Sequence, residues 1–158
     1  TQFIPSTYKR LAVDFDRDGR RDLVRSVPDA LGSTANFLRS SGWQPGEPWM
    51  IEVKVPASYS GPSGRKTTAS LSTWGSRGVV RADGKPLSGG GSAGLLLPAG
   101  PGGPGFLVFR NFNAIYSYNL AESYALASSH RADRIARYPA CRTPSPPAHA
   151  RSSPPPPR

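Results

Sequence analysis

The sequence has almost no cysteine and no long apolar run. Cys141 is the single cysteine among 158 residues, which excludes both a disulfide within the chain and a zinc site built on cysteines. No stretch of eighteen consecutive apolar residues occurs, whereas a helix needs about twenty to cross a bilayer. We therefore expect no transmembrane segment in this chain.

Acidic residues are half as many as basic ones. The chain has 20 Lys and Arg against 10 Asp and Glu, which gives a net charge of +10. This excess suits an anionic partner such as nucleic acid, a membrane surface or the acidic peptides and polymers of a cell wall. A solvated basic surface with no dedicated partner is the alternative. Because the basic residues are scattered and few aromatic residues lie between them, we expect no nucleic-acid binding.

The composition also divides the chain into a folded part and a tail. Hydrophobic residues make up 37% of the chain, against 17 glycines and 18 prolines, so we expect one loop-rich domain with a single core over residues 1–137. Residues 138–158 are rich in proline, serine and arginine, and we expect them to be disordered. This tail is interpreted as a native linker, as a polyproline ligand or as the product of a frameshift.

Apolar periodicity and capping residues predict several helices. Apolar residues recur with helical spacing from residue 30 to 38, Ser26 or Val27 is the expected cap, and Gly42 ends the run. We expect three residues of this helix to face a core: Leu31, Ala35 and Leu38. A second helix is predicted over residues 121–137, and a short one near the start is expected to be capped by Ser6.

Short apolar or alternating runs predict a small antiparallel sheet. The four predicted strands are residues 50–55, 79–81, 95–97 and 106–109. Because Pro56 ends the first of them, we expect that strand at an edge of the sheet. Residues 57–66 are predicted to be a loop and residues 67–74 a short helix. The fold class is therefore predicted to be α+β, with the sheet beside a helical body.

Alternating carboxylates near the start of the chain match the first half of an EF-hand calcium loop. The predicted ligand residues at loop positions 1, 3, 5, 7 and 9 are Asp14, Asp16, Asp18, Arg20 (through its carbonyl) and Asp22. Position 12 is Arg25 rather than a glutamate, so we expect weak affinity for calcium, and Asp29 is a candidate substitute ligand. The alternative is an Asp/Gly turn that binds its own backbone and starts a helix.

Several separated blocks of the sequence resemble the second half of the lytic murein transglycosylase B family. These blocks are residues 2–8 (QFIPSTY), 12–16, 27–38, 42–49 and 106–127. They occur in the family's order and cover roughly residues 1–137. Members of this family cleave bacterial peptidoglycan. The resemblance therefore implies a lysozyme-like helical body, peptidoglycan glycan strands as the partner, and a location in the bacterial periplasm or cell envelope.

The same resemblance implies a set of sugar-binding residues. Carried over position by position, they are Gln2, Tyr118, Asn119 and Tyr124. An asparagine offers both a donor and an acceptor to an N-acetyl group, and a tyrosine offers a flat face and one hydroxyl. From spacing alone, the alternatives are a surface glutamine, a capping asparagine and two core tyrosines. Leu120 departs from the small polar residue that is usual in the family.

The family is a group of lyases that use one glutamic acid as general acid and then as base. That residue protonates the glycosidic oxygen between N-acetylmuramic acid and N-acetylglucosamine. The muramyl 6-hydroxyl then closes onto the anomeric carbon and gives a 1,6-anhydro product. The family's glutamate precedes the block that starts at Gln2. The three glutamates of this chain are interpreted as surface residues: Glu47, Glu52 and Glu122.

The start of the chain bears on activity as well. The chain begins at Thr1 rather than at a methionine, and we expect it to be the C-terminal part of a larger transglycosylase domain. Alone, it is expected to bind glycan weakly and to catalyse nothing. The rival interpretation is a non-catalytic module that binds calcium, glycan or both.

Overall fold

The structure is a computed structural model, which describes residues 2–137. The elements, in chain order, are α1 Pro5–Leu11, α2 Val27–Ser40, β1 Met50–Lys54, β2 Gly64–Ser70, α3 Leu71–Ser76, β3 Val80–Arg81, β4 Ser92–Leu96, β5 Gly105–Val108, α4 Arg110–Asn119 and α5 Glu122–Arg137. The predicted α+β class is confirmed. The tail predicted over residues 138–158 lies outside the described part.

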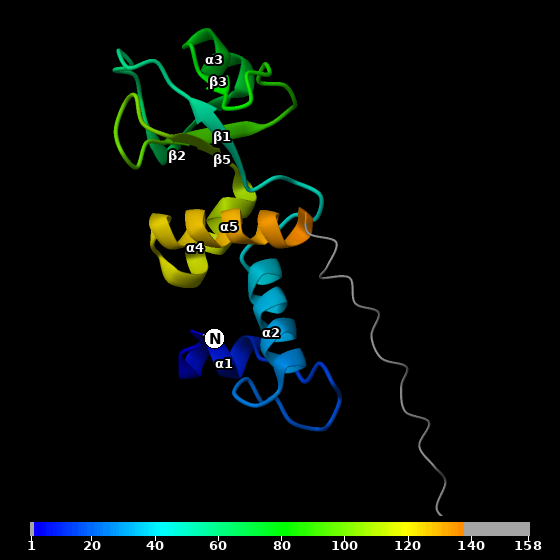
Figure 1. The fold of residues 1–158 in the computed structure, drawn as a ribbon. Helices are drawn as coiled ribbons and strands as arrows, with labels where there is room; N and C mark the ends of the chain where they lie inside the picture. Colours follow the sequence, from blue (N-terminus) through cyan, green and yellow to red (C-terminus); the bar gives the residue numbers. More distant parts are fainter. Residues whose placement is uncertain (1, 138–158) are drawn as a thin grey trace, which may run out of the picture.

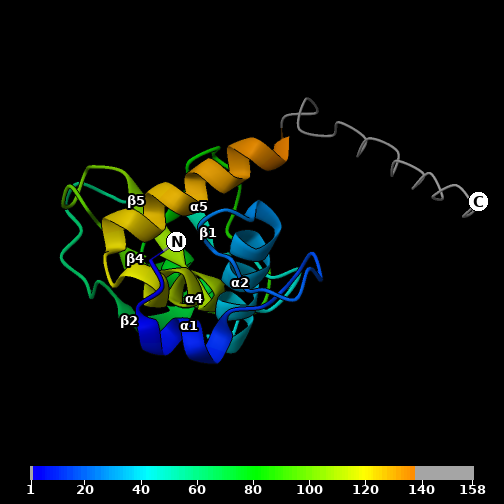
Figure 2. The same ribbon diagram turned by 90° about the horizontal axis from the view of Figure 1, so that it is seen from below.

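The elements are arranged in three levels, as Figure 1 shows. The sheet and α3 lie at one end, α4 and α5 cross the middle, and α1 and α2 lie at the other end. Seen from below in Figure 2, α1 and α2 lie in front of α4. Within residues 2–137, none of the helices combines the length and the apolar character that a membrane span requires.

The sheet is antiparallel, with the strand order β2-β4-β5-β1-β3. The predicted hairpin is confirmed, since Leu95 of β4 lies opposite Leu107 of β5. The prediction that the first strand lies at an edge is wrong, because β1 pairs with β5 on one side and with the short β3 on the other. Pro56 lies beyond the last paired residue, Lys54, and so removes no hydrogen bond from the ladder.

The segment between β1 and α3 also differs from its prediction. Residues 64–70, expected as the end of a loop and the start of a helix, form the edge strand β2. Helix α3 begins only at Leu71, where the Ser70 side chain accepts a hydrogen bond from the Thr73 amide at 3.1 Å. Leu71 and Trp74, three residues apart in this helix, are both buried.

Both faces of the sheet are covered, because successive side chains of a strand point to opposite faces. The cluster that includes α3 contains Val53, Val55, Leu71, Trp74, Val79, Ala93, Leu95, Leu107 and Phe109. The cluster that includes α4 and α5 contains Leu96, Val108, Phe112 and Ala125. Trp49 packs against the second cluster, and its ring centroid lies 5.7 Å from that of Trp43. The two tryptophans therefore pack together beside the second cluster.

Helix α2 forms as predicted but buries a different face. Ser26 is its cap and accepts a hydrogen bond from the Asp29 amide. Leu31 is 67% exposed and Ala35 is exposed as well, so the prediction that they face a core is wrong; the buried residues are Asp29 and Ser33. These polar side chains turn inward because they bind the backbone of the preceding loop.

Helix α1 starts earlier than predicted. Pro5 occupies its first turn, where the missing N–H costs nothing, and Ile4 is the cap residue. The expectation that Ser6 caps this helix is therefore wrong.

Candidate functional site

The loop between α1 and α2 is anchored by one buried carboxylate. Asp29, in the first turn of α2, accepts hydrogen bonds from the amides of Phe15 (2.7 Å), Asp22 (2.8 Å) and Asp16 (3.4 Å). Burial alone would raise the pKa of Asp29, but these amide hydrogen bonds outweigh it and hold the pKa below the ordinary value of 3.8. Because both of its oxygens accept amides of the loop, Asp29 acts as an anchor for the loop backbone.

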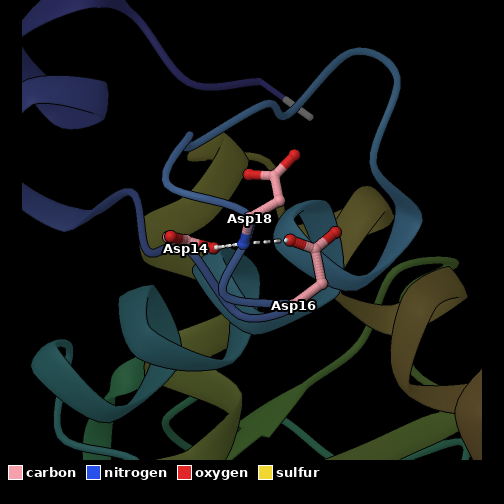
Figure 3. A group of neighbouring side chains, drawn as sticks. All are labelled: Asp14, Asp16 and Asp18. Atoms are coloured by element: carbon pink, nitrogen blue, oxygen red, sulfur yellow. Dashed lines mark hydrogen bonds between the residues drawn. The ribbon is translucent and has the colours of Figure 1, made fainter. Parts of the chain in front are cut away.

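Three of the predicted metal ligands converge at the tip of this loop (Figure 3). One carboxylate oxygen from each of Asp14, Asp16 and Asp18 lies within 4.8 Å of the other two. The amide of Asp18 donates to Asp14 at 3.2 Å and to Asp16 at 3.3 Å, and Gly19 makes the turn with a φ of +89°. A calcium ion takes oxygens at about 2.3–2.6 Å, so the spacing of the three fits one such ion.

The other two predicted ligand residues are placed differently. Asp22 lies outside that group, and its Oδ1 accepts the amides of Val24 at 3.0 Å and Arg25 at 2.9 Å. These backbone hydrogen bonds hold the pKa of Asp22 below its ordinary value. The amide of Arg20 donates to Asp18 at 2.8 Å. Ligation by the Arg20 carbonyl and by Asp22 therefore stays a prediction.

The four predicted sugar-binding residues are brought together at the other end of α1. The side-chain amide of Asn119 donates to Oε1 of Gln2 at 2.5 Å, across 117 positions of the chain. The backbone N–H of Gln2 donates to the hydroxyl of Tyr118 at 3.1 Å. The rings of Tyr118 and Tyr124 are stacked, with centroids 6.5 Å apart and an interplanar angle of 16°.

A hollow of about 320 Å³ lies at this point of convergence. Its lining residues are Gln2, Phe3, Ile4, Thr7, Phe37, Ser117, Tyr118, Asn119 and Leu120. The ring of Phe37 meets Tyr118 edge-on at 5.2 Å, and Phe3 lies 6.0 Å from Phe37. An aromatic wall beside polar amide groups suits a sugar, which has both apolar faces and hydrogen-bonding edges.

Phe3 and Phe37 were not among the predicted site residues. Both lie inside blocks of the sequence that resemble the transglycosylase family, which was the one available signal. Phe37 reaches Tyr118 because α2 packs against α4, and a local sequence pattern does not reveal that packing.

The alternatives that spacing alone suggested do not hold for Asn119, Tyr118 and Tyr124. Asn119 is the last residue of α4 rather than a cap, since Leu120 is the C-cap and Phe109 the N-cap. Tyr118 is half-buried and Tyr124 is 36% exposed, so neither is a core tyrosine.

The glutamates of the chain lie away from this hollow. Glu47 and Glu52 are exposed, and the side chain of Glu122 is half exposed. None of the three is among the residues that line the hollow. His130 is exposed.

Comparison with known proteins gives consistent matches. The family model for the transglycosylase SLT domain matches residues 1–133. Membrane-bound lytic murein transglycosylase B from Escherichia coli (strain K12) is 38% identical over 128 residues, which are 80% of this chain and 34% of that protein. This chain therefore spans about a third of the length of the curated relative that it matches.

Solved structures match the fold as well. The crystal structure of SltB3 from Pseudomonas aeruginosa in complex with NAG-anhNAM-pentapeptide has a TM-score of 0.81 and 47% identity, over 87% of this chain and 38% of that one. The structure of the Escherichia coli lytic transglycosylase Slt35 in complex with calcium has a TM-score of 0.69 and 36% identity, over 86% of this chain and 43% of that one. The expected lysozyme-like fold is confirmed by these neighbours.

Proposed function

This chain belongs to the transglycosylase SLT domain family, and from that premise we propose that it forms the glycan-binding part of a peptidoglycan lytic transglycosylase. The observation that carries this proposal is that Gln2, Tyr118 and Asn119 line one hollow, with Tyr124 stacked on Tyr118. Roles as a surface glutamine, a capping asparagine or core tyrosines do not explain why Gln2 binds both Asn119 and Tyr118.

The proposed chemistry divides between binding and proton transfer. Asn119 would exchange its hydrogen bond to Gln2 for the N-acetyl group of a sugar, and Tyr124 would stack on a sugar face. Proton transfer would come from the glutamic acid that the resembled family carries upstream of the block at Gln2. The chain's own residues would thus bind and orient the glycan.

The location follows from the substrate. We propose that the protein acts in the bacterial periplasm or cell envelope, where peptidoglycan is found. The Escherichia coli relative is named as membrane-bound, which supports the envelope as the site of action.

Calorimetry with a soluble muropeptide tests the binding proposal. We expect the wild-type chain to release heat and Asn119→Ala to weaken the affinity about tenfold, since one amide pair to the N-acetyl group is lost. Gln44→Ala is the matched control, because the hydrogen bonds of Gln44 with Asn111 run through its backbone. Absence of heat with the wild-type chain, or equal affinities of the two variants, would contradict the proposal.

We also propose that Asp14, Asp16 and Asp18 hold a structural calcium ion. Three converging carboxylates are the oxygen ligands that calcium prefers, and Slt35 was solved in complex with calcium. A bound cation would neutralise the repulsion between these side chains and stiffen the loop that leads into α2. The affinity is expected to be weak, because Arg25 occupies the place of the bidentate glutamate.

A further inference from the structure

One arginine of the sheet contacts both helices that carry the sugar-binding residues. The guanidinium carbon of Arg65, in β2, lies 3.9 Å from the ring centroid of Tyr116, and its Nη1 donates to Asn113 at 2.7 Å. Both of these partners belong to α4. The Nε of Arg65 also lies 3.9 Å from a carboxylate oxygen of Glu122, in the first turn of α5.

This arginine is held in an unusually enclosed position. Its side chain is only 16% exposed, and its Nε is buried without a hydrogen-bond partner among the described residues. A donor placed in this way is seldom kept in a folded protein without a reason, and an exposed position would satisfy it with water. The enclosure places the guanidinium between α4 and α5.

An irregularity in β2 aims Arg65 at the helices. The pairing of β2 with β4 jumps between residues 64 and 68, since Gly64 lies opposite Leu95 and Thr68 opposite Gly94. Extra residues on one strand re-aim a side chain, as β-bulges do beside functional sites. Gly94 leaves room for the backbone of β2 at this irregularity, because a Cβ at Gly94 would lie 2.5 Å from the Arg65 carbonyl oxygen.

The corner that Arg65 spans is held in an unfavourable backbone conformation. Leu120, between α4 and α5, has a φ of +54°, a left-handed value that costs energy for any residue with a Cβ. Its side chain is 70% exposed and so contributes little packing to hold that conformation. Contacts on either side of the corner must therefore stabilise it, and Asn119 directly precedes it.

We propose that Arg65 is a positioning residue, which fixes the corner between α4 and α5 so that Asn119 and Tyr124 face the same glycan. It touches no sugar itself and acts through Tyr116, Asn113 and Glu122. The inference rests on the proposed function for the identity of the ligand. The effect of Arg65 on the position of Asn119 is expected without a ligand as well. Through Arg65, the sheet would then influence the affinity for glycan.

The first test needs no glycan. In ¹H–¹⁵N spectra of the full chain, Arg65→Met is expected to move the side-chain amide signals of Asn119, because the hydrogen bond to Gln2 loses its geometry. Arg77→Met is the matched control, since the Arg77 guanidinium also lies over a ring, that of Trp74 at 4.9 Å. Unmoved Asn119 signals in Arg65→Met, or equal shifts in both variants, would overturn the proposal.

The second test measures coupling between Arg65 and Asn119. At a temperature where circular dichroism shows all variants folded, Arg65→Met is expected to raise the Kd for muropeptide about five- to tenfold, and Arg77→Met to leave it unchanged. In an Asn119→Ala background, Arg65→Met should raise the Kd by a clearly smaller factor than in the wild type, since one of the two groups that it positions is gone. Equal effects in both backgrounds would indicate a general loss of structure and overturn the proposal.

Two controls keep the outcomes distinct. If Arg65→Met does not fold, Arg65→Lys takes its place, since it keeps the charge and loses the planar donor fork. If the wild-type chain binds no muropeptide, the proposed function fails, while the Asn119 signals still decide the role of Arg65.

Discussion

Among the acidic residues near the start of the chain, Asp29 alone is fully buried. Its carboxylate accepts three backbone amides of the loop between α1 and α2, and so joins both ends of that loop to the first turn of α2. A carboxylate bound by several amides is held in its ionised form. The loop can therefore keep its shape without a cation, while Asp14, Asp16 and Asp18 accept hydrogen bonds from backbone amides of the same loop.

Replacing this anchor should weaken the fold. Asp29→Asn puts an amide donor where two oxygens accept N–H groups, so at least one buried partner loses its acceptor. We expect the Tm to fall by about 5–10 °C, measured by calorimetry at pH 7. Asp83→Asn, which alters an exposed pair with Arg81, should shift it by less than about 2 °C. Equal shifts would argue against the anchor.

The same carboxylate predicts how stability depends on pH. Because the pKa of Asp29 is lower in the folded chain than the ordinary 3.8, the folded state binds fewer protons in acid than the unfolded state. The stabilisation is complete above about pH 5 and is lost as the pH falls below about 4 toward the folded-state pKa. A Tm profile from pH 7 to pH 2.5 should fall more steeply for wild type than for Asp29→Asn. Parallel profiles would contradict this assignment.

Calcium should raise the stability of the loop if it binds. With a Kd of about 10⁻⁴–10⁻³ M, 10 mM calcium is expected to raise the Tm by about 3–8 °C, and a chelator should reverse the rise. Asp18→Asn removes one of the three converging charges and should abolish the effect, whereas Asp83→Asn should keep it. A rise of the same size in Asp18→Asn would show that calcium acts elsewhere.

At the scale of elements, the edge strand β2 depends on a glycine in its neighbour. The irregular stretch of β2 passes so close to β4 that a Cβ on Gly94 would lie 2.5 Å from one backbone oxygen and 2.8 Å from another. Backbone atoms of a paired strand move less easily than the end of a flexible side chain. The shape of β2, and with it the direction of Arg65, thus requires glycine at this position.

Gly94→Ala should therefore be destabilising by about 2–3 kcal/mol in urea unfolding. Gly90→Ala is the matched control, because a Cβ at Gly90 meets no atom within 4 Å. If the two variants unfold at the same urea concentration, the close approach does not constrain the strand.

The elements show which features a sequence pattern can predict. The start of α2 follows from Ser26 and the proline after Val27, and both signals are local. The face that α2 buries depends on the loop anchored by Asp29, so apolar spacing misassigned Leu31. Strand β2 was missed for a related reason: its residues are mostly small or polar, and only the pairing with β4 makes them a strand.

The candidate sites differ in the same way. Asp14, Asp16 and Asp18 lie within five residues of each other, so their spacing alone predicts that they converge. The predicted sugar-binding residues come from opposite ends of the folded part, and no periodicity connects Gln2 with Asn119. Resemblance to a family supplied that grouping, and Arg65 was missed because neither signal pointed to it.

For the whole molecule, the main expectation concerns catalysis. The 158-residue chain should release no 1,6-anhydromuropeptides from purified peptidoglycan, because none of its three glutamates lines the hollow that holds the predicted glycan. Mass spectrometry of the soluble products measures this, and the Escherichia coli relative serves as the positive control. Release of anhydro products that Glu122→Gln abolishes would identify a general acid within this chain.

The arrangement of Gln2 beside Asn119 also has a consequence for how the protein is made. At about 5–20 residues per second, the ribosome adds Asn119 roughly 6–23 seconds after Gln2. Throughout that interval Phe3 lacks the ring of Tyr118, which lies 6.3 Å away in the folded chain, and a prematurely terminated chain never acquires it. The hollow between Gln2 and Asn119 thus forms only in chains whose synthesis has passed α4.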